Sequence, residues 1–173
     1  GVGGAAAGTL TFMCGGTKQA YEAGKPYLDI MGKNVFHAGD AGNGQVAKVA
    51  NNMLLGIHMI GTCEAFNLAE KLGLDAQTFY DISSTASGQN WSMTSYCPAP
   101  GPVESAPSNR DYEAGFAAAM MLKDMRLAKD AASSAQASIP LGEHAETLYA
   151  AMEAAGKEGL DFSGVMKLIQ GTL

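Results

Sequence analysis

The sequence is poor in charge and in cysteine. Only 16% of its 173 residues are Asp, Glu, Lys or Arg, against about a quarter in a typical soluble domain. The three cysteines, Cys14, Cys63 and Cys97, form no Cys-x-x-Cys pair. This spacing excludes a zinc ribbon and a disulfide scaffold, and it is typical of a protein from a reducing compartment. The low charge predicts that another domain or subunit covers part of the surface.

Positive charge and long apolar runs are also missing. The formal net charge of −6 argues against nucleic acid and anionic membranes as partners, because both attract basic surfaces. No apolar run reaches the roughly 18 residues of a membrane helix, and no signal-peptide pattern is visible. We therefore expect a cytoplasmic protein, or one of the mitochondrial matrix if its source is eukaryotic. The chain opens at Gly1 rather than at a methionine, which predicts that it is part of something longer.

The apolar residues, 47% of the total, are enough to build a core. The first forty residues predict a strand at 9–14, a helix capped by Thr17 that is interrupted and then resumes at Pro26, and a strand at 35–37. So small a unit cannot bury both faces of a sheet. We interpret it as the closing part of a larger domain, the alternative being a lid or hairpin on the helical part. Residues 1–5 are glycine-rich without the GxGxxG spacing, and we expect a turn there.

The rest of the chain is predicted to be helical, so the expected fold is mostly α. Residues 41–72 carry apolar side chains on every face, which predicts a buried helix that serves as the spine of the domain. Residues 84–110 hold four of the six prolines and form a long irregular segment, a kind of segment that is usually functional or disordered. The other predicted helices are 75–83 with Asp75 as its cap, 112–135, 140–156 with Pro140 first, and a short one capped by Asp161.

The most informative stretch runs from Gly39 to Asn52. A glycine-dense turn lets a partner approach the backbone and leads into a helix N-terminus. Lys48 and Asn52 are four residues apart and share a face of that helix. Burial and the positive end of the helix dipole both predict a lowered pKa for Lys48, which suits a general acid or base. The plainer alternatives are that Lys48 extends to solvent and that Asn52 is a satisfied buried amide.

A second candidate group lies further along the chain. Phe116, Met120 and Lys123 are spaced to share a helix face, which places a charge beside an aromatic ring. An ordinary ion pair of Lys123 with a neighbouring carboxylate is the alternative. Trp91 and Tyr96 are candidates to line a pocket from the long loop, or else they simply pack on the core.

No metal site is predicted. The three histidines, His37, His58 and His144, have no spacing typical of metal ligands. None of them has a serine or cysteine partner that the sequence can support.

Four segments in this order resemble the C-terminal half of the β-hydroxyacid dehydrogenase family, most closely its 3-hydroxyisobutyrate dehydrogenase branch. Residues 1–13 are similar to the stretch after the family's Ser-Gly-Gly turn. Gly42 to Asn52 matches the catalytic GxGxxxKxxxN motif, the most specific of the four. Residues 90–101 resemble the loop of that branch, and residues 116–124 resemble the cofactor-side motif.

The resemblance implies oxidation of a small β-hydroxy acid, such as 3-hydroxyisobutyrate, to its semialdehyde by hydride transfer. Lys48 would take or give the hydroxyl proton, and Asn52 would hold Lys48 and the substrate oxygen in register. The substrate carboxylate would meet backbone N–H groups around Gly1. Trp91 and Tyr96 would close the pocket.

The implied cofactor is NAD, with NADP left open and no metal. Lys123 and Phe116 would lie on the cofactor side, near the nicotinamide, and Asp124 would hold the helix around Lys123. Residues 1–39 would be the closing strands and helix of a dinucleotide-binding Rossmann domain whose remainder is missing, which predicts an inactive isolated chain. Residues 40–173 would be the helical catalytic and dimerisation domain, in a homo-oligomer such as a dimer or tetramer.

Two alternatives to this activity stay open. One keeps the family and changes the substrate, to tartronate semialdehyde or another small hydroxy acid, because one methyl group in a pocket is worth only about 1–3 kcal/mol. The other is a non-catalytic helical module that dimerises. The apolar helix at 41–72 and the low charge fraction favour this module as much as they favour the enzyme.

Overall fold

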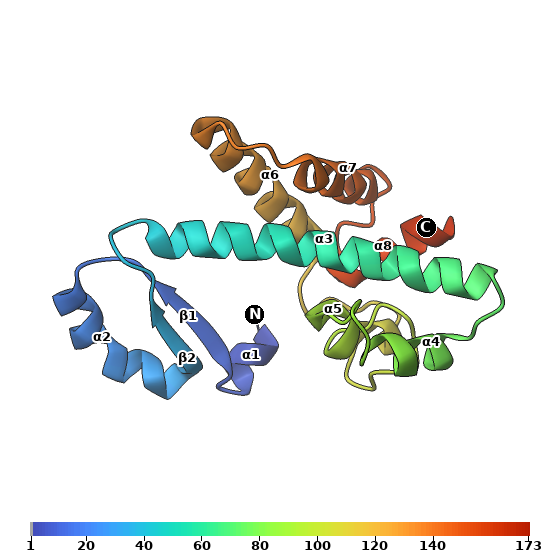
Figure 1. The fold of residues 1–173 in the computed structure, drawn as a ribbon, viewed down its shortest axis with the longest axis horizontal. Coiled ribbons are helices and arrows are strands. Elements are labelled where there is room, and N and C mark those ends of the chain that lie inside the picture. Colours follow the sequence, from blue (N-terminus) through green and yellow to red (C-terminus); the bar gives the residue numbers. More distant parts are fainter. Residues whose placement is uncertain (1) are drawn as a thin grey trace. The chain divides into compact units, whose positions relative to one another are not determined.

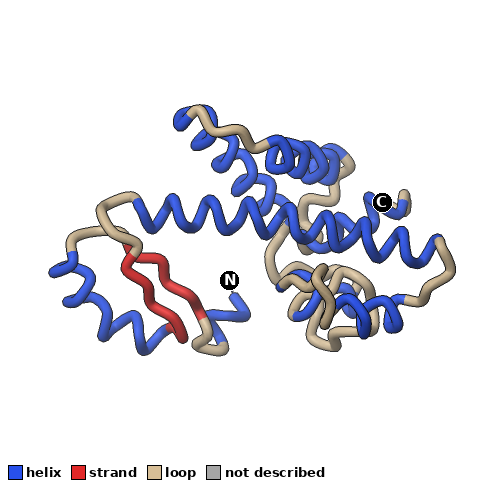
Figure 2. The backbone as a smooth tube through the Cα atoms, viewed as in Figure 1, coloured by secondary structure: helices blue, strands red, loops and turns tan. Residues whose placement is uncertain are grey.

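The computed structural model describes residues 2–173 and is mostly helical, as the sequence predicted (Figure 1, Figure 2). It divides into two compact units, an N-terminal one that ends at Asn52 and a C-terminal one, Met53–Leu173. The N-terminal elements are α1 Val2–Ala6, β1 Leu10–Cys14, α2 Lys18–Met31 and β2 Gly32–His37. The helix α3, Asn43–Lys71, runs through the boundary. It is followed by α4 Ala76–Ser83, α5 Trp91–Thr94, the 3-10 helix η1 Pro107–Arg110, α6 Ala118–Ala135, α7 Pro140–Ala154, η2 Phe162–Gly164 and α8 Val165–Gln170.

The N-terminal unit is built around a parallel strand pair joined by a helix. Strands β1 and β2 pair from Thr11 with Asn34 to Cys14 with His37, and α2 connects them. The Thr17 side chain accepts a hydrogen bond from the amide of Ala20 at 3.2 Å, so the predicted N-cap is confirmed. The expected strand–helix–strand order is therefore present.

Three local expectations for this unit were wrong. Residues 2–6 form the short helix α1 rather than a turn, with the Ala7 amide donating to the Gly3 carbonyl at 3.0 Å. Helix α2 continues through Pro26 at the cost of one backbone hydrogen bond, and an ion pair of Lys25 with Asp29 at 2.7 Å spans the site. Strand β2 begins at Gly32, which pairs with Leu10, so the strand is longer than predicted.

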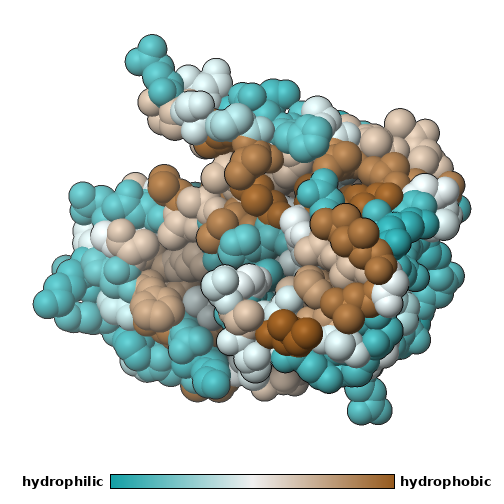
Figure 3. Space-filling model, turned by 45° about the vertical axis from the view of Figure 1, so that its right-hand side comes forward, coloured by the Kyte–Doolittle hydropathy of each residue, from teal (hydrophilic) through white to brown (hydrophobic). Residues whose placement is uncertain are grey.

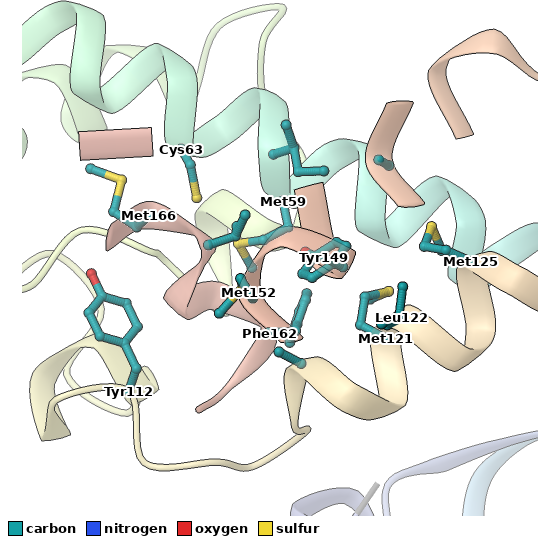
Figure 4. Packing of buried hydrophobic residues seen from close by; sticks show 14 of the residues in the cluster. Met59, Cys63, Tyr112, Met121, Leu122, Met125, Tyr149, Met152, Phe162 and Met166 are labelled. Atoms are coloured by element: carbon teal, nitrogen blue, oxygen red, sulfur yellow. The ribbon is translucent and has the colours of Figure 1, made fainter. Parts of the chain in front are cut away.

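The core of the C-terminal unit is rich in methionine and gathers side chains from several helices (Figure 4). Figure 4 shows Met59 and Cys63 of α3, Met121 and Met125 of α6, and Tyr149 and Met152 of α7 around one cluster. Met side chains are flexible enough to fill the irregular gaps where helices cross. Helices α6 and α7 pack on one another, and Pro140 stands at the start of α7 as predicted.

Helix α3 was predicted to be buried on every face, and this was wrong. Val46, Leu54 and Leu68 are exposed by 67%, 50% and 61%. The buried residues of its second part, from Gly56 to Phe66, recur at helical spacing on one side. An apolar composition all round therefore does not mean burial all round in this chain. Apolar side chains also gather in brown patches on the face shown in Figure 3.

Helix α6 begins at Ala118, six residues later than predicted. The helix cannot start at Tyr112 as predicted, because Asp111 and Tyr112 adopt left-handed backbone angles, with φ of 50° and 60°. The chain then forms an antiparallel bridge between Ala117 and Asp161. The caps of the neighbouring short helices are as predicted, with Asp75 before α4 and Asp161 before η2. Within residues 2–173, no helix is both long and apolar enough to cross a bilayer.

Candidate functional site

A tight backbone contact in the N-terminal unit determines where α3 begins. A Cβ atom added to Gly44 would fall on the carbonyl oxygen of Met13, at the end of β1. One added to Gly15 would lie 2.8 Å from the carbonyl oxygen of Asp40 and 2.9 Å from the amide of Gly44. Only glycines at both positions allow the N-terminus of α3 to approach the end of β1 this closely.

Lys48 and Asn52 lie on the first turns of α3, both half-buried. Their spacing places them on one helix face, as expected. The side chain of Asn52 accepts a hydrogen bond from the amide group of Asn51 at 3.2 Å, and both Lys48 and Asn52 make further interactions. The structure thus presents an amine and an amide one turn apart near the start of α3.

In the C-terminal unit, the long segment brings Trp91 and Tyr96 together. Their rings stack with centroids 5.1 Å apart and planes at 21°. Asn90 caps α5 through the amide of Met93 at 3.1 Å and is hydrogen-bonded to Thr62 of α3, which anchors the segment. Trp91 is half-exposed, whereas the Tyr96 hydroxyl points inward and donates to Asp161 at 2.9 Å. The pair therefore forms a stacked aromatic wall that is exposed to solvent at Trp91.

Phe116 is brought to the same cluster, although not in the way predicted. It precedes α6 and so does not share a helix face with Met120 and Lys123. Its ring instead meets Phe162 edge-on, with centroids 5.6 Å apart, and Phe162 also lies 5.3 Å from Tyr96. Tertiary contacts thus unite the predicted substrate side and the predicted cofactor side of this unit.

Lys123 lies on α6 with its ammonium 3.2 Å from the carboxylate of Asp124. The Lys123 side chain is 51% exposed, while that of Asp124 is almost fully buried and makes further interactions. An ion pair of Lys123 with a neighbouring carboxylate was the simpler expectation, and it is present. A role of Lys123 toward a cofactor stays a prediction.

Burial governs the ionisable groups next to this cluster. Burial, and then the charge of Asp161, raise the pKa of Tyr96 well above its usual value, so Tyr96 stays a neutral hydrogen-bond donor. Burial likewise raises the pKa of the Cys97 thiol to about 11 and that of Cys63 well above normal. Neither thiol is therefore suited to nucleophilic chemistry near neutral pH. Among the described residues, no three His, Cys, Asp or Glu side chains gather as metal ligands.

Two further observations delimit the candidate site. Gly1, predicted to meet the substrate carboxylate, lies outside the described residues. A hollow of about 700 Å³ in the C-terminal unit lies elsewhere, between Phe66 and Glu70 of α3, Tyr112, and Lys167 of α8, and none of the predicted site residues line it.

Sequence reasoning missed the central position of Asp161. It was expected only as a helix cap, yet its side chain also holds Tyr96 and the backbone of Gly115 and Phe116. Those partners lie 65, 46 and 45 positions away in the chain. The only local signal was an aspartate before an apolar residue and Ser163, which is the pattern of a cap.

Comparison with known families decides the identity of the fold. The model described as "NAD-binding of NADP-dependent 3-hydroxyisobutyrate dehydrogenase" matches residues 42–169. A second family model, described as the NAD-binding domain of 6-phosphogluconate dehydrogenase, matches residues 1–39. The chain belongs to the 3-hydroxyisobutyrate dehydrogenase family. The resemblance to the C-terminal portion of this family is thereby confirmed.

Relatives in the 3-hydroxyisobutyrate dehydrogenase family are close. The NAD-dependent L-serine dehydrogenase of Pseudomonas aeruginosa is 48% identical over 99% of this chain, and so is the 3-hydroxyisobutyrate dehydrogenase of the same organism. A solved structure of 3-hydroxyisobutyrate dehydrogenase from Mycobacterium tuberculosis with L-serine is 46% identical over 98% of this chain, with a TM-score of 0.93. That of Salmonella typhimurium is 28% identical over 97% of this chain, with a TM-score of 0.83.

The chain spans 58% of the length of both Pseudomonas relatives and of the mycobacterial structure, and 57% of the Salmonella structure. What it shares with the 3-hydroxyisobutyrate dehydrogenase family is therefore the helical part and the strands next to it. The predicted domain boundary after residue 39 stays a prediction, since compactness alone divides the chain later, inside α3.

Proposed function

We propose that this chain is the C-terminal part of a nicotinamide-dependent dehydrogenase that oxidises 3-hydroxyisobutyrate, or a similar small β-hydroxy acid, to the semialdehyde. The observation that carries the proposal is the position of Lys48 and Asn52 on the first turns of α3, behind the glycine contact at Gly44. The family match over the same residues supports it. The chain by itself is expected to be inactive.

Lys48 is proposed as the acid–base group. Its amine would accept the proton of the substrate hydroxyl as the hydride leaves the neighbouring carbon, and would return the proton in the reverse reaction. Asn52, one turn further along α3, would keep the Lys48 amine and the substrate oxygen aligned through its amide.

The cofactor is proposed to be NAD, with Phe116 and Lys123 on its nicotinamide side. When bound, NAD supplies the acceptor for the hydride. The residues fit that end of the cofactor, because an aromatic ring packed edge-on against Phe162 and a half-exposed ammonium paired with Asp124 offer an apolar surface and a fixed cation. Asp124 would hold Lys123 in place through their ion pair. The choice between NAD and NADP would depend on residues outside this set.

The substrate is proposed to lie against the stacked Trp91 and Tyr96 rings. L-Serine and 3-hydroxyisobutyrate both carry a hydroxyl on the carbon next to the carboxyl-bearing one. The relatives named for each of them are equally similar to this chain. Measuring kcat/KM for 3-hydroxyisobutyrate, L-serine and glycerate, the reduced form of tartronate semialdehyde, would rank the three, and the highest value identifies the substrate.

Replacing Lys48 by alanine in the complete gene product tests the proposal. Turnover should fall by about two to four orders of magnitude, the usual contribution of a positioned acid or base. Lys48→Arg should rescue little, because a guanidinium does not release its proton near neutral pH. The measurement is NADH absorbance, with Lys71→Ala at the far end of the same helix as the control. If Lys48→Ala retained more than about a tenth of the turnover, the assignment would be wrong.

The second candidate function is a non-catalytic helical module that forms a homo-oligomer. It is favoured by the exposed apolar residues of α3 and its neighbours, Leu54, Leu68, Leu72 and Ile82, since such residues often mark subunit contacts. Oligomerisation is also compatible with the enzyme, as a dimer or tetramer. Sedimentation of the chain tests self-association, and only hydroxy-acid-dependent NADH formation separates the two candidates.

The cytoplasm, or the mitochondrial matrix for a eukaryotic source, is the proposed location, and a relative from Dictyostelium discoideum is named as mitochondrial.

A further inference from the structure

Asp161 is a fully buried carboxylate that accepts five hydrogen bonds. One oxygen, Oδ1, accepts from the amide of Ser163 at 3.0 Å and from its hydroxyl at 2.7 Å. The other, Oδ2, accepts from the Tyr96 hydroxyl at 2.9 Å and from the amides of Gly115 at 2.9 Å and Phe116 at 3.0 Å. The Oδ1 bonds account for a helix cap, but those to Oδ2 do not.

The partners of Oδ2 come from two segments that the proposed function places on opposite sides of the reaction. Tyr96 belongs to the long segment of the proposed substrate wall, and Phe116 to the proposed cofactor side. Their fit is tight, because a Cβ atom on Gly115 would lie 2.6 Å from the Tyr96 hydroxyl oxygen. Oδ2 of Asp161 therefore connects the Tyr96 hydroxyl to the backbone amides of Gly115 and Phe116.

This linkage is strong for a physical reason. Hydrogen bonds to a buried charged acceptor are stronger than neutral ones, and leaving such a group partly unpaired is costly. The Tyr96 ring cannot turn away without breaking its bond to Asp161 and its stack on Trp91. The backbone at Phe116 is fixed a second time, because its carbonyl accepts from the amide of Phe162 at 2.8 Å.

We propose that Asp161 is a positioning residue that fixes the Tyr96 wall relative to Phe116 and thereby sets where the substrate can lie against that wall. The consequence for substrate rests on the proposed function, whereas the positioning of the rings does not. Asp161 itself would touch neither substrate nor cofactor. Its effect would pass through Tyr96 and through the backbone of Gly115 and Phe116.

The first experiment uses the only tryptophan of the chain, Trp91, as a probe and needs no activity. Asp161→Asn replaces one carboxylate oxygen by an N–H₂ group. This group cannot accept the hydrogen bonds that the oxygen accepted, because it is itself a donor. Because the ring of Tyr96 stacks on Trp91, we expect altered tryptophan emission and near-UV circular dichroism. Gly115→Ala should give the same change while keeping the carboxylate. Tyr112→Phe is the matched control for the emission, since it removes a buried hydroxyl bond to Pro98 at 2.8 Å and should leave the tryptophan emission unchanged.

The second experiment measures kinetics in the complete gene product. Asp161→Asn should raise KM for the hydroxy acid by up to about 10- to 100-fold, because at most the free energy of a hydrogen bond to a charged group is passed to substrate binding through Tyr96. The pH profile of kcat should not move. Tyr96→Phe should raise it similarly. The double variant should be no worse than Asp161→Asn alone, because both changes break the same bond.

The results distinguish a failure of the proposal for Asp161 from a failure of the proposed function. Unchanged tryptophan spectra in both Asp161→Asn and Gly115→Ala would overturn the proposal, and so would KM effects that multiply in the double variant. If Asp161→Asn does not fold, Gly115→Ala decides, since it displaces Tyr96 without removing the carboxylate. If the wild-type protein oxidises no β-hydroxy acid, the proposed function fails, and the spectra alone decide the role of Asp161.

Discussion

At the scale of single residues, missing side chains matter as much as those present. Gly44 and Gly15 occupy positions where any Cβ atom would strike backbone, which is less able to yield than the end of a side chain. Gly115 is a glycine for a related reason, since the Tyr96 hydroxyl occupies the space of its Cβ atom. These contacts hold the start of α3 against the end of β1, and Tyr96 against Asp161.

We expect Gly44→Ala to lower the free energy of unfolding by about 1–3 kcal/mol or more, because the added methyl group has to push the backbone of Met13 away. Gly61→Ala is the control in the same helix. Nothing lies within 4 Å of its Cβ position, so this change should stabilise α3 by up to about 1 kcal/mol. Urea unfolding measures both. Equal effects of the two substitutions would contradict the proposed close contact.

At the scale of elements, side-chain caps begin several of the helices. Thr17, Asp75 and Asn90 each accept a hydrogen bond from a backbone amide three residues later. Asp75 accepts from both the amide of Thr78 at 3.0 Å and its hydroxyl at 2.6 Å. These bonds, led by that of the Thr78 hydroxyl, lower the pKa of Asp75. The cap of α4 should therefore depend on pH.

The sign of that dependence follows from the direction of the shift. A carboxyl whose pKa is lower in the folded state stabilises the fold above its unfolded pKa of about 3.9, and this contribution is lost as pH falls further, through the folded pKa. Asp75→Asn should match the wild type closely at pH 7, because asparagine caps well, but should lack this loss. Urea unfolding of both proteins from pH 5 to pH 2.5 measures the difference. An unchanged difference across that range would refute the charged cap.

At the scale of the whole molecule, burial is distributed unevenly between the two units. Helix α2 has no buried residue, and the strand pair beside it is only partly covered. The C-terminal unit contains the continuous methionine-rich core (Figure 4). Helix α3 shows both situations, since only Gly44 is buried before Met53, whereas Gly56, Met59 and Cys63 are among several buried residues after it.

We expect amide hydrogen exchange to reveal this difference within one helix. Residues 43–52 should exchange faster than residues 56–66, because opening the first part exposes little buried apolar surface. The two-stranded sheet should likewise be less protected than α6 and α7. Mass spectrometry of peptides along α3 measures this, corrected for intrinsic exchange rates. Uniform protection from residue 43 to residue 66 would show that the helix opens as one unit.

Much of the fold follows from short-range signals. Thr17, Asp75 and Pro140 were identified correctly because capping depends on residues within a turn of each other. The family motif from Gly42 to Asn52 was likewise readable as a contiguous pattern. The start of α6 was not, because it depends on the left-handed backbone at Asp111 and Tyr112 and on a bridge to Asp161 far along the chain.

The sequence by itself determined the mostly helical fold, the family and the candidate acid–base pair on α3, because helix periodicity, caps and a contiguous motif are local properties. The tertiary structure decided which face of α3 is buried, where Phe116 lies, and that Asp161 joins Tyr96 to the backbone before α6. The last two features depend on donors that are 45 to 65 positions away from Asp161 in the chain and meet on its buried carboxylate. Only the packed chain brings such distant donors to the same acceptor, since burial removes the water that would otherwise bind them.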